Sequence, residues 1–126
     1  LVAGGYVRLS GRAAAYSAGG PTTPPAWAVA QPLLDRKPDA LLVVDDSRVR
    51  RGILAAGTIS GSRVAFTGTS VAAPQLAAWA IERLAAGLPA DRQAVATAAD
   101  PAAPPLPADR GGAGRIALPP VQSVPR

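Results

Sequence analysis

A run of five consecutive apolar residues, Ala40 to Val44, restricts the fold of this chain more than any other feature of its sequence. A strand that faces water on one side alternates apolar and polar residues, whereas this run is apolar on both sides. A strand of this kind is buried between two layers, as in a parallel α/β sheet. Asp45 and Asp46 close the run, and we interpret them as turn or helix-cap residues. The sequence therefore predicts an α/β fold with a buried strand over residues 40–44.

Further strands are predicted on both sides of this run. Residues 1–9 are apolar and β-compatible, and a turn separates them from a short extended stretch over 13–17. Downstream, Ser60-Gly61-Ser62 is typical of a hairpin bend, which makes Val64 to Thr67 the returning strand. A last short strand is expected within residues 113–118.

Two helices are predicted after the hairpin. The longer one runs from about Ser70 to Ala86, and Gly87 is placed to end it. A weaker helix runs from about Ala90 to Ala99. Before the buried strand, residues 26–36 have room for a helical turn, which Pro32 interrupts.

The composition of the chain indicates a thin core. Hydrophobic residues make up 48% of its 126 residues, but only 4% are aromatic and most of the others are alanines. Burial of apolar surface contributes about 25 cal/mol per Å², so small side chains contribute little. We therefore expect the helices to pack tightly only against a larger partner surface.

The charge of the chain does not indicate a nucleic-acid partner. Thirteen Lys and Arg residues against eight Asp and Glu residues give a net charge of +5. Binding to phosphates requires a basic stripe on one surface. The arginines are instead scattered from Arg8 to Arg126, and the cluster of Arg48, Arg50 and Arg51 is interpreted as an exposed loop or a dibasic cleavage site. The dominance of Arg, Ala, Gly and Pro fits a GC-rich bacterial genome.

Several residue types are absent from the sequence, and their absence restricts its chemistry. Without cysteine, the chain forms no disulfide and has no cysteine zinc site. Without histidine, it lacks the commonest general base. Methionine is absent as well and the chain starts at Leu1, which leads us to expect that it was excised from a longer polypeptide. No apolar run approaches the roughly 20 residues that cross a bilayer, so no membrane span is expected.

The segment GTSVAAP, residues 68–74, lies where the longest predicted helix begins, and it has two interpretations. In the first, Ser70 is a helix cap whose oxygen accepts an orphan N–H of the first turn. In the second, Ser70 is a nucleophile held at the start of a rigid helix, and its own N–H donates to an oxyanion. The small residues behind it let this helix run through the protein interior: Val71, Ala72, Ala73, Ala77 and Ala78.

GTSVAAP resembles the nucleophile motif of the subtilisin-like serine proteases, which reads Gly-Thr-Ser, any residue, Ala, any residue, Pro. LVAGGYVRLSGRAAAYSAGGP, residues 1–21, resembles the strand, turn and serine-containing loop that precede this motif in the family. GAGRIAL, residues 112–118, resembles the element that ends the catalytic domain. The sequence departs from the family at Tyr16 and Ala18, which replace a common phenylalanine and serine, and residues 22–38 resemble an insertion.

The resemblance implies that residues 1–118 are the C-terminal part of a subtilisin-like catalytic domain and that 119–126 are a tail. The implied fold has three layers, a mainly parallel sheet and a buried central helix that carries the nucleophile. Ser70 is the implied catalytic residue, and it hydrolyses a peptide bond through an acyl-enzyme. Gly68 and Thr69 would shape the approach to it, and Pro74 would fix the first turns. Family members bind calcium and are secreted or lie in the cell envelope, but no cluster of oxygen ligands supports a metal or cofactor site here.

The aspartate, histidine and oxyanion-hole asparagine of the family belong to segments that precede the part matched here. A serine hydroxyl needs an adjacent base, and Lys37 in a proline-flanked loop is a weak substitute for histidine. We therefore expect this chain alone to be inactive, its partner to be the preceding part of the same domain, and its substrate to be a polypeptide. The alternative is a catalytically dead subtilisin-like scaffold or protein-binding module. Upstream Asp, His and Asn motifs favour the enzyme, and replacements at those positions favour the scaffold.

Overall fold

The apolar run forms strand β2 (Ala40–Asp45) in the computed structural model, which describes residues 1–20, 38–103, 106 and 108–116. Strand β1 (Ala3–Val7) pairs with it in parallel, from Ala3 opposite Ala40 to Tyr6 opposite Val43. Leu41, Leu42 and Val44 are fully buried, which confirms that both faces of β2 are covered. The parallel pair confirms the α/β class that the sequence predicts.

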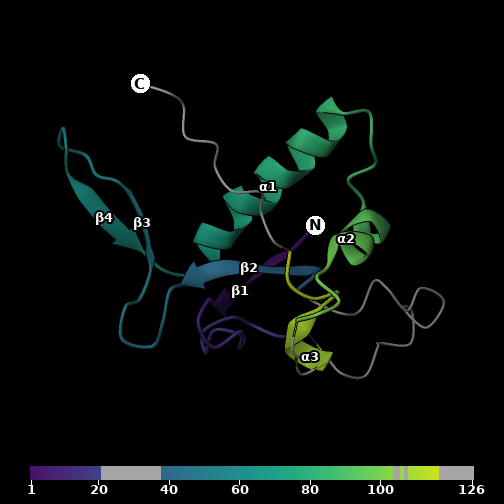
Figure 1. Ribbon diagram of the computed structural model, residues 1–126, viewed down its shortest axis with the longest axis horizontal. Coiled ribbons are helices and arrows are strands. Elements are labelled where there is room, and N and C mark those ends of the chain that lie inside the picture. The colour runs from purple at the N-terminus through teal and green to yellow at the C-terminus, as the bar shows by residue number, and fades with distance from the viewer. Residues whose placement is uncertain (21–37, 104–105, 107, 117–126) are drawn as a thin grey trace.

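A hairpin follows β2 and projects away from the parallel pair (Figure 1). Its strands are β3 (Ile53–Ala56) and β4 (Arg63–Phe66), which pair antiparallel with Ile53 opposite Phe66. This confirms the predicted hairpin, with a returning strand that starts one residue before the predicted position. Every residue of β4 is exposed, because the hairpin meets the rest of the described fold only at the end that joins β2.

Helix α1 (Thr69–Ala85) packs against both β1 and β2. Its buried residues are Ala72, Leu76 and Trp79, a spacing of four and three residues that forms one stripe along the helix. On the other side, Ile81 and Leu84 keep 65% and 62% of their surface exposed. The described part of the chain therefore covers α1 on one face only.

The remaining elements close the other end of the parallel pair. Helix α2 (Arg92–Ala98) buries Ala94 and Val95 in the same core, and α3 (Ala108–Gly111) is a single turn within the proline-rich segment. The predicted last strand is reduced to isolated bridges from Arg115 to Leu41 and from Ile116 to Ala99. Likewise, the predicted extended stretch over 13–17 makes one bridge, from Ala13 to Tyr6.

The core that these elements enclose is thin, as the composition predicts. It consists largely of small side chains around one tryptophan: Ala14, Ala40, Leu42, Val44, Ala72, Leu76, Trp79, Ala94, Val95 and Ile116. Alanine buries little apolar area, so each large member carries a large share of the stability. The predicted helical turn within 26–36 and the predicted tail at 119–126 lie outside the described residues.

The start of α2 offers a clean test of local stability. The carboxylate of Asp91 caps this helix, because its Oδ1 accepts a hydrogen bond of 2.8 Å from the N–H of Ala94. Asp91→Ala is expected to lower the free energy of unfolding by about 1 kcal/mol, measured by chemical denaturation. Asp91→Asn keeps an oxygen acceptor and should retain most of the stability; an equal loss in both variants would contradict the capping role.

Candidate functional site

Ser70 is the second residue of α1, and its side chain is exposed at the start of the helix. The helix begins one residue before the predicted position, after Gly68, whose φ of 110° is accessible mainly to glycine. No side chain makes a capping hydrogen bond at this end of α1, so the capping interpretation of Ser70 is wrong. Gly68 supplies the sharp approach to the helix that the sequence predicts.

The backbone around Ser70 is electropositive. The Val71 N–H donates to the Gly68 carbonyl at 2.9 Å, and the partial positive charge of the helix dipole concentrates at the first turn, where an α-helix leaves N–H groups without an intrahelical acceptor. Pro74 is the sixth residue of α1 and has no N–H, so the usual bond from position 74 to the Ser70 carbonyl cannot form. Ser70 therefore presents a hydroxyl beside an electropositive backbone, which is a suitable environment for stabilising a developing oxyanion.

Asp45, at the end of β2, organises the chain that leads to Ser70. Its Oδ2 accepts a hydrogen bond from the Tyr16 hydroxyl at 2.7 Å. Its Oδ1 accepts from the N–H of Gly52 at 2.7 Å and from Thr67 Oγ1 at 2.9 Å. The Tyr16 oxygen in turn accepts from the N–H of Gly68 at 3.3 Å and lies 2.8 Å from Thr67 Oγ1. We call these five residues the Asp45 network.

The Asp45 network joins four segments that are distant in the sequence. It connects the loop after β1, the end of β2, the residue before β3 and the two residues before α1. Gly68 is both a member of the network and the entry to α1, two residues before Ser70. The network therefore fixes the direction from which the backbone enters the helix, and with it the position of Ser70.

The protonation states in the network follow from its hydrogen bonds. Burial raises the pKa of Asp45, but the bonds from Tyr16, Gly52 and Thr67 and the charge of Arg51 together outweigh burial and lower it below 3.8. Partial burial and the neighbouring Asp45 carboxylate raise the pKa of Tyr16 above 10.0, although its bond with Thr67 opposes them. At neutral pH Asp45 is therefore a carboxylate, and Tyr16 is a protonated donor.

The loop that carries Tyr16 is itself held by two side chains. Arg110 Nη2 donates to the backbone carbonyls of Ala14, Ala15 and Ser17 at 3.3, 2.8 and 2.7 Å. Ser17 is fully buried, and its Oγ accepts from the N–H of Gly5 in β1 at 3.0 Å. These bonds satisfy buried polar groups and restrict the loop. The hydrogen bond between Tyr16 and Asp45 therefore costs little further conformational entropy.

Gln75 ties α1 to the exposed edge of β2. Its Nε2 donates to the carbonyl of Val43 in the strand and to the carbonyl of Val71 in the helix, both at 2.8 Å. The Gln75 side chain thus supplies the Val43 carbonyl with the hydrogen-bond donor that a neighbouring strand would otherwise provide. The bond between Gln75 and Val43 fixes the position of α1 along β2, about one turn after Ser70.

The sequence predicts Ser70 as a site residue but does not predict the network that positions it. Asp45 is predicted to be a turn or helix-cap residue, whereas its carboxylate joins four segments and caps no helix. A carboxylate at the carboxyl end of a buried parallel strand is the signal that points to it, because functional groups of α/β sheets gather at that edge. Asp46, also interpreted as a turn residue, forms ion pairs with Arg8 and Arg50. Lys37 lies outside the described residues.

The part of the chain that the structure describes was also compared with the requirements of a metal site and of a membrane span. There, no group of three or more Asp and Glu residues is placed to hold a metal ion. No helix in those ranges has the length and apolar composition needed to cross a bilayer. Comparison of the chain with models of protein families, with curated proteins and with solved structures gives no match.

Proposed function

We propose that Ser70 is the nucleophile of a subtilisin-like serine endopeptidase, of which this chain forms the C-terminal part of the catalytic domain. One observation carries the proposal. The serine of the GTSVAAP motif is exposed in the first turn of α1 and makes no capping bond there, so its hydroxyl is available for chemistry.

The reaction requires a base that this sequence does not contain. In the proposed mechanism, a histidine outside the sequence takes the proton from Ser70 Oγ as the oxygen attacks the scissile carbonyl. The N–H of Ser70 donates to the oxyanion that forms, and the histidine then protonates the leaving amine. Water hydrolyses the resulting acyl-enzyme and regenerates the serine. The polypeptide substrate binds before the first half of the reaction. In each half, the histidine accepts one proton and then donates it.

Asp45 supports the site without acting as its base. Its two oxygens already accept three hydrogen bonds, and its pKa lies below 3.8, so it is a poor proton acceptor at neutral pH. In the proposal, Asp45 holds the Tyr16 hydroxyl, which accepts the hydrogen bond of Gly68 at the start of α1. Asp45 is therefore a positioning residue and not a member of the triad.

A fluorophosphonate probe, which reacts with activated serines, tests the proposal directly. The chain alone should react no faster than a surface serine, because an unactivated hydroxyl is a weak nucleophile. The longer polypeptide that supplies Asp, His and Asn motifs should become labelled, and peptide mapping should locate the probe on Ser70. Rapid labelling of the chain alone would show that the base lies within it, contrary to the mechanism above.

The same experiment separates the enzyme from the catalytically dead scaffold. If the longer polypeptide has replacements at the histidine or aspartate positions and Ser70 stays unlabelled, the scaffold or protein-binding function is correct. The exposed Ile81 and Leu84 of α1 suit that function as well, since they leave an apolar surface for a partner. Failure of labelling in a polypeptide with all three motifs intact would overturn the proposal.

A further inference from the structure

A cavity of about 650 Å³ lies at the carboxyl ends of β1 and β2. Three elements of the described fold contribute to it: the end of β1, the loop that carries Tyr16, and the loop between β2 and β3. Its lining combines an apolar floor of Val7, Ala13 and Ala15 with three arginines, Arg12, Arg48 and Arg51. This volume is within the range of about 300–1,000 Å³ that is typical of small-molecule sites.

The three arginines give this cavity, which we call the arginine cavity, an excess of positive charge. Within the described residues, no side-chain hydrogen bond or ion pair engages the guanidinium groups of Arg12, Arg48 or Arg51. Asp45 is the one acidic residue of the lining, and three donors from other residues occupy its oxygens. Arginine stays protonated at any physiological pH, so the cavity presents donors and charge that no described residue neutralises fully.

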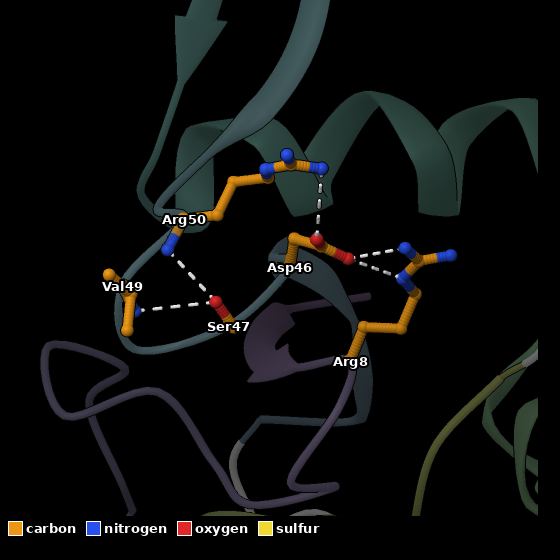
Figure 2. A network of polar contacts seen from close by, with 5 residues as sticks. All are labelled: Arg8, Asp46, Ser47, Val49 and Arg50. Carbon is orange, nitrogen blue, oxygen red and sulfur yellow. Dashed lines mark hydrogen bonds and ion pairs between the residues drawn. The ribbon is translucent and has the colours of Figure 1, made fainter.

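The loop that carries Arg48 and Arg51 is held in place before any ligand binds (Figure 2). Ser47 Oγ accepts hydrogen bonds from the N–H groups of Val49 at 3.3 Å and Arg50 at 2.9 Å, and the Ser47 N–H donates to the Arg50 carbonyl at 2.9 Å. These bonds close a tight turn around Arg48. The ordering cost of the turn is therefore met in the folded protein, which favours ligand binding.

Asp46 strengthens the base of this turn. Its Oδ1 accepts from Arg8 Nε at 2.7 Å, and its Oδ2 lies 3.9 Å from Arg50 Nη1. Figure 2 shows that Arg50 reaches one oxygen of the Asp46 carboxylate and Arg8 reaches the other. Arg8 and Arg50 are thus engaged by Asp46, whereas the arginines of the cavity are left for a ligand.

We propose that the arginine cavity binds an acidic side chain of a polypeptide. A carboxylate matches the planar fork of a guanidinium and forms paired, charge-assisted hydrogen bonds with it. The apolar floor and the Tyr16 ring accommodate the aliphatic part of a glutamate or aspartate. A nucleic-acid backbone would need a stripe of charge along the surface, whereas these three arginines line one concave site.

The position of the cavity connects it with Ser70. Tyr16 lines the cavity, and its hydroxyl accepts the hydrogen bond of Gly68, two residues before Ser70. A polypeptide whose acidic side chain occupies the cavity therefore passes close to the start of α1. If Ser70 is the nucleophile, this polypeptide is its substrate, and the enzyme prefers an acidic residue near the scissile bond; that step rests on the proposed function.

Binding is tested by fluorescence anisotropy of the full chain with fluorescein-labelled tetraglutamate, and with tetraglutamine as the neutral probe. Tetraglutamate should bind and tetraglutamine should not. Arg48→Gln and Arg51→Gln should each raise Kd about tenfold, the effect of losing one charge-assisted hydrogen bond. Arg63→Gln removes the same charge from the exposed hairpin strand β4, away from the cavity, and should change Kd less than twofold. Circular dichroism of each variant checks that it is folded.

Several results would overturn the inference. An equal loss of binding in Arg63→Gln would show attraction by net charge alone, and equal binding of tetraglutamine would show that the carboxylate is not recognised. Duplex DNA that displaces the peptide and loses affinity in the same variants would make the cavity a nucleic-acid site. Ser70→Ala should bind tetraglutamate normally, so a failure of this inference is distinguishable from a failure of the fluorophosphonate test.

Discussion

Under the proposed function, Ser70→Ala is expected to lower peptide hydrolysis by roughly 10⁶-fold, the loss that follows removal of the nucleophile from a Ser-His-Asp protease. The physical reason is that the acyl-enzyme path needs the oxygen of this side chain, and alanine leaves only the slower attack by water. The assay uses the longer polypeptide that supplies the histidine, with kcat measured on a peptide substrate. KM should change little, since the hydroxyl contributes to the transition state and not to binding of the substrate.

Ser60→Ala is the matched control for this variant. Ser60 is also exposed, and it lies at the bend of the hairpin away from α1. Its replacement removes the same hydroxyl from a surface that the proposed reaction does not use, so kcat should stay within a factor of two. Residual activity above one hundredth of the wild type in Ser70→Ala would place the nucleophile elsewhere.

Asp45→Ala is expected to lower the free energy of unfolding by about 3 kcal/mol. The variant leaves the N–H of Gly52 buried without its acceptor, and it removes the carboxylate to which the Tyr16 and Thr67 hydroxyls both donate. Hydrogen bonds to a buried carboxylate contribute about 1.5–3 kcal/mol each, and the two hydroxyls recover part of the loss by bonding with water. Chemical denaturation followed by tryptophan fluorescence measures the change.

Asp46→Ala is the neighbouring control. This variant also removes a carboxylate, but the ion-pair partners of Asp46, Arg8 and Arg50, keep 64% and 82% of their side-chain surface exposed. Exposed ion pairs contribute at most about 1 kcal/mol, so the variant should be nearly as stable as the wild type. Equal losses in Asp45→Ala and Asp46→Ala would show that the Asp45 network does not carry the stability assigned to it.

The pH dependence of stability identifies the same carboxylate. Because the folded protein holds the pKa of Asp45 below its ordinary value of 3.8, the unfolded chain binds its proton at a higher pH than the folded protein does. The contribution of Asp45 is therefore fully present above that ordinary value, and it is lost as the pH falls through the lower folded pKa. Wild type should lose this part of its stability below about pH 4, whereas Asp45→Ala should have no such step.

The periodic elements of the fold are predictable because neighbouring residues specify them. The buried strand, the returning strand of the hairpin and the two helices lie within one residue of their predicted ends, except that α2 starts two residues late at Arg92. Turn residues such as Gly61 and Gly68, each with a positive φ, mark these boundaries in the sequence itself. The exposed nucleophile candidate Ser70 is predictable for the same reason, since a short motif at a helix start identifies it.

The Asp45 network and the arginine cavity are not predictable in this way. Tyr16 and Thr67 are separated by 51 positions, and their hydroxyls lie 2.8 Å apart because the loop after β1 and the segment before α1 both meet Asp45 at the end of β2. Arg110 and Ala15 meet across 95 positions for a similar reason. Side-chain chemistry indicates what each residue can do, but not which residues become neighbours.

The amino-acid sequence is enough to predict the buried strand, the hairpin, the helix that begins at GTSVAAP and the thin, alanine-rich core. Each of these depends on residues adjacent in the chain or on composition, through hydrophobic periodicity and the backbone preferences of glycine and proline. Three other features follow only from the folded arrangement: Asp45 joins four segments, one face of α1 is covered and three arginines share a cavity. Those facts depend on pairing and packing between distant segments, whose geometry no local pattern encodes.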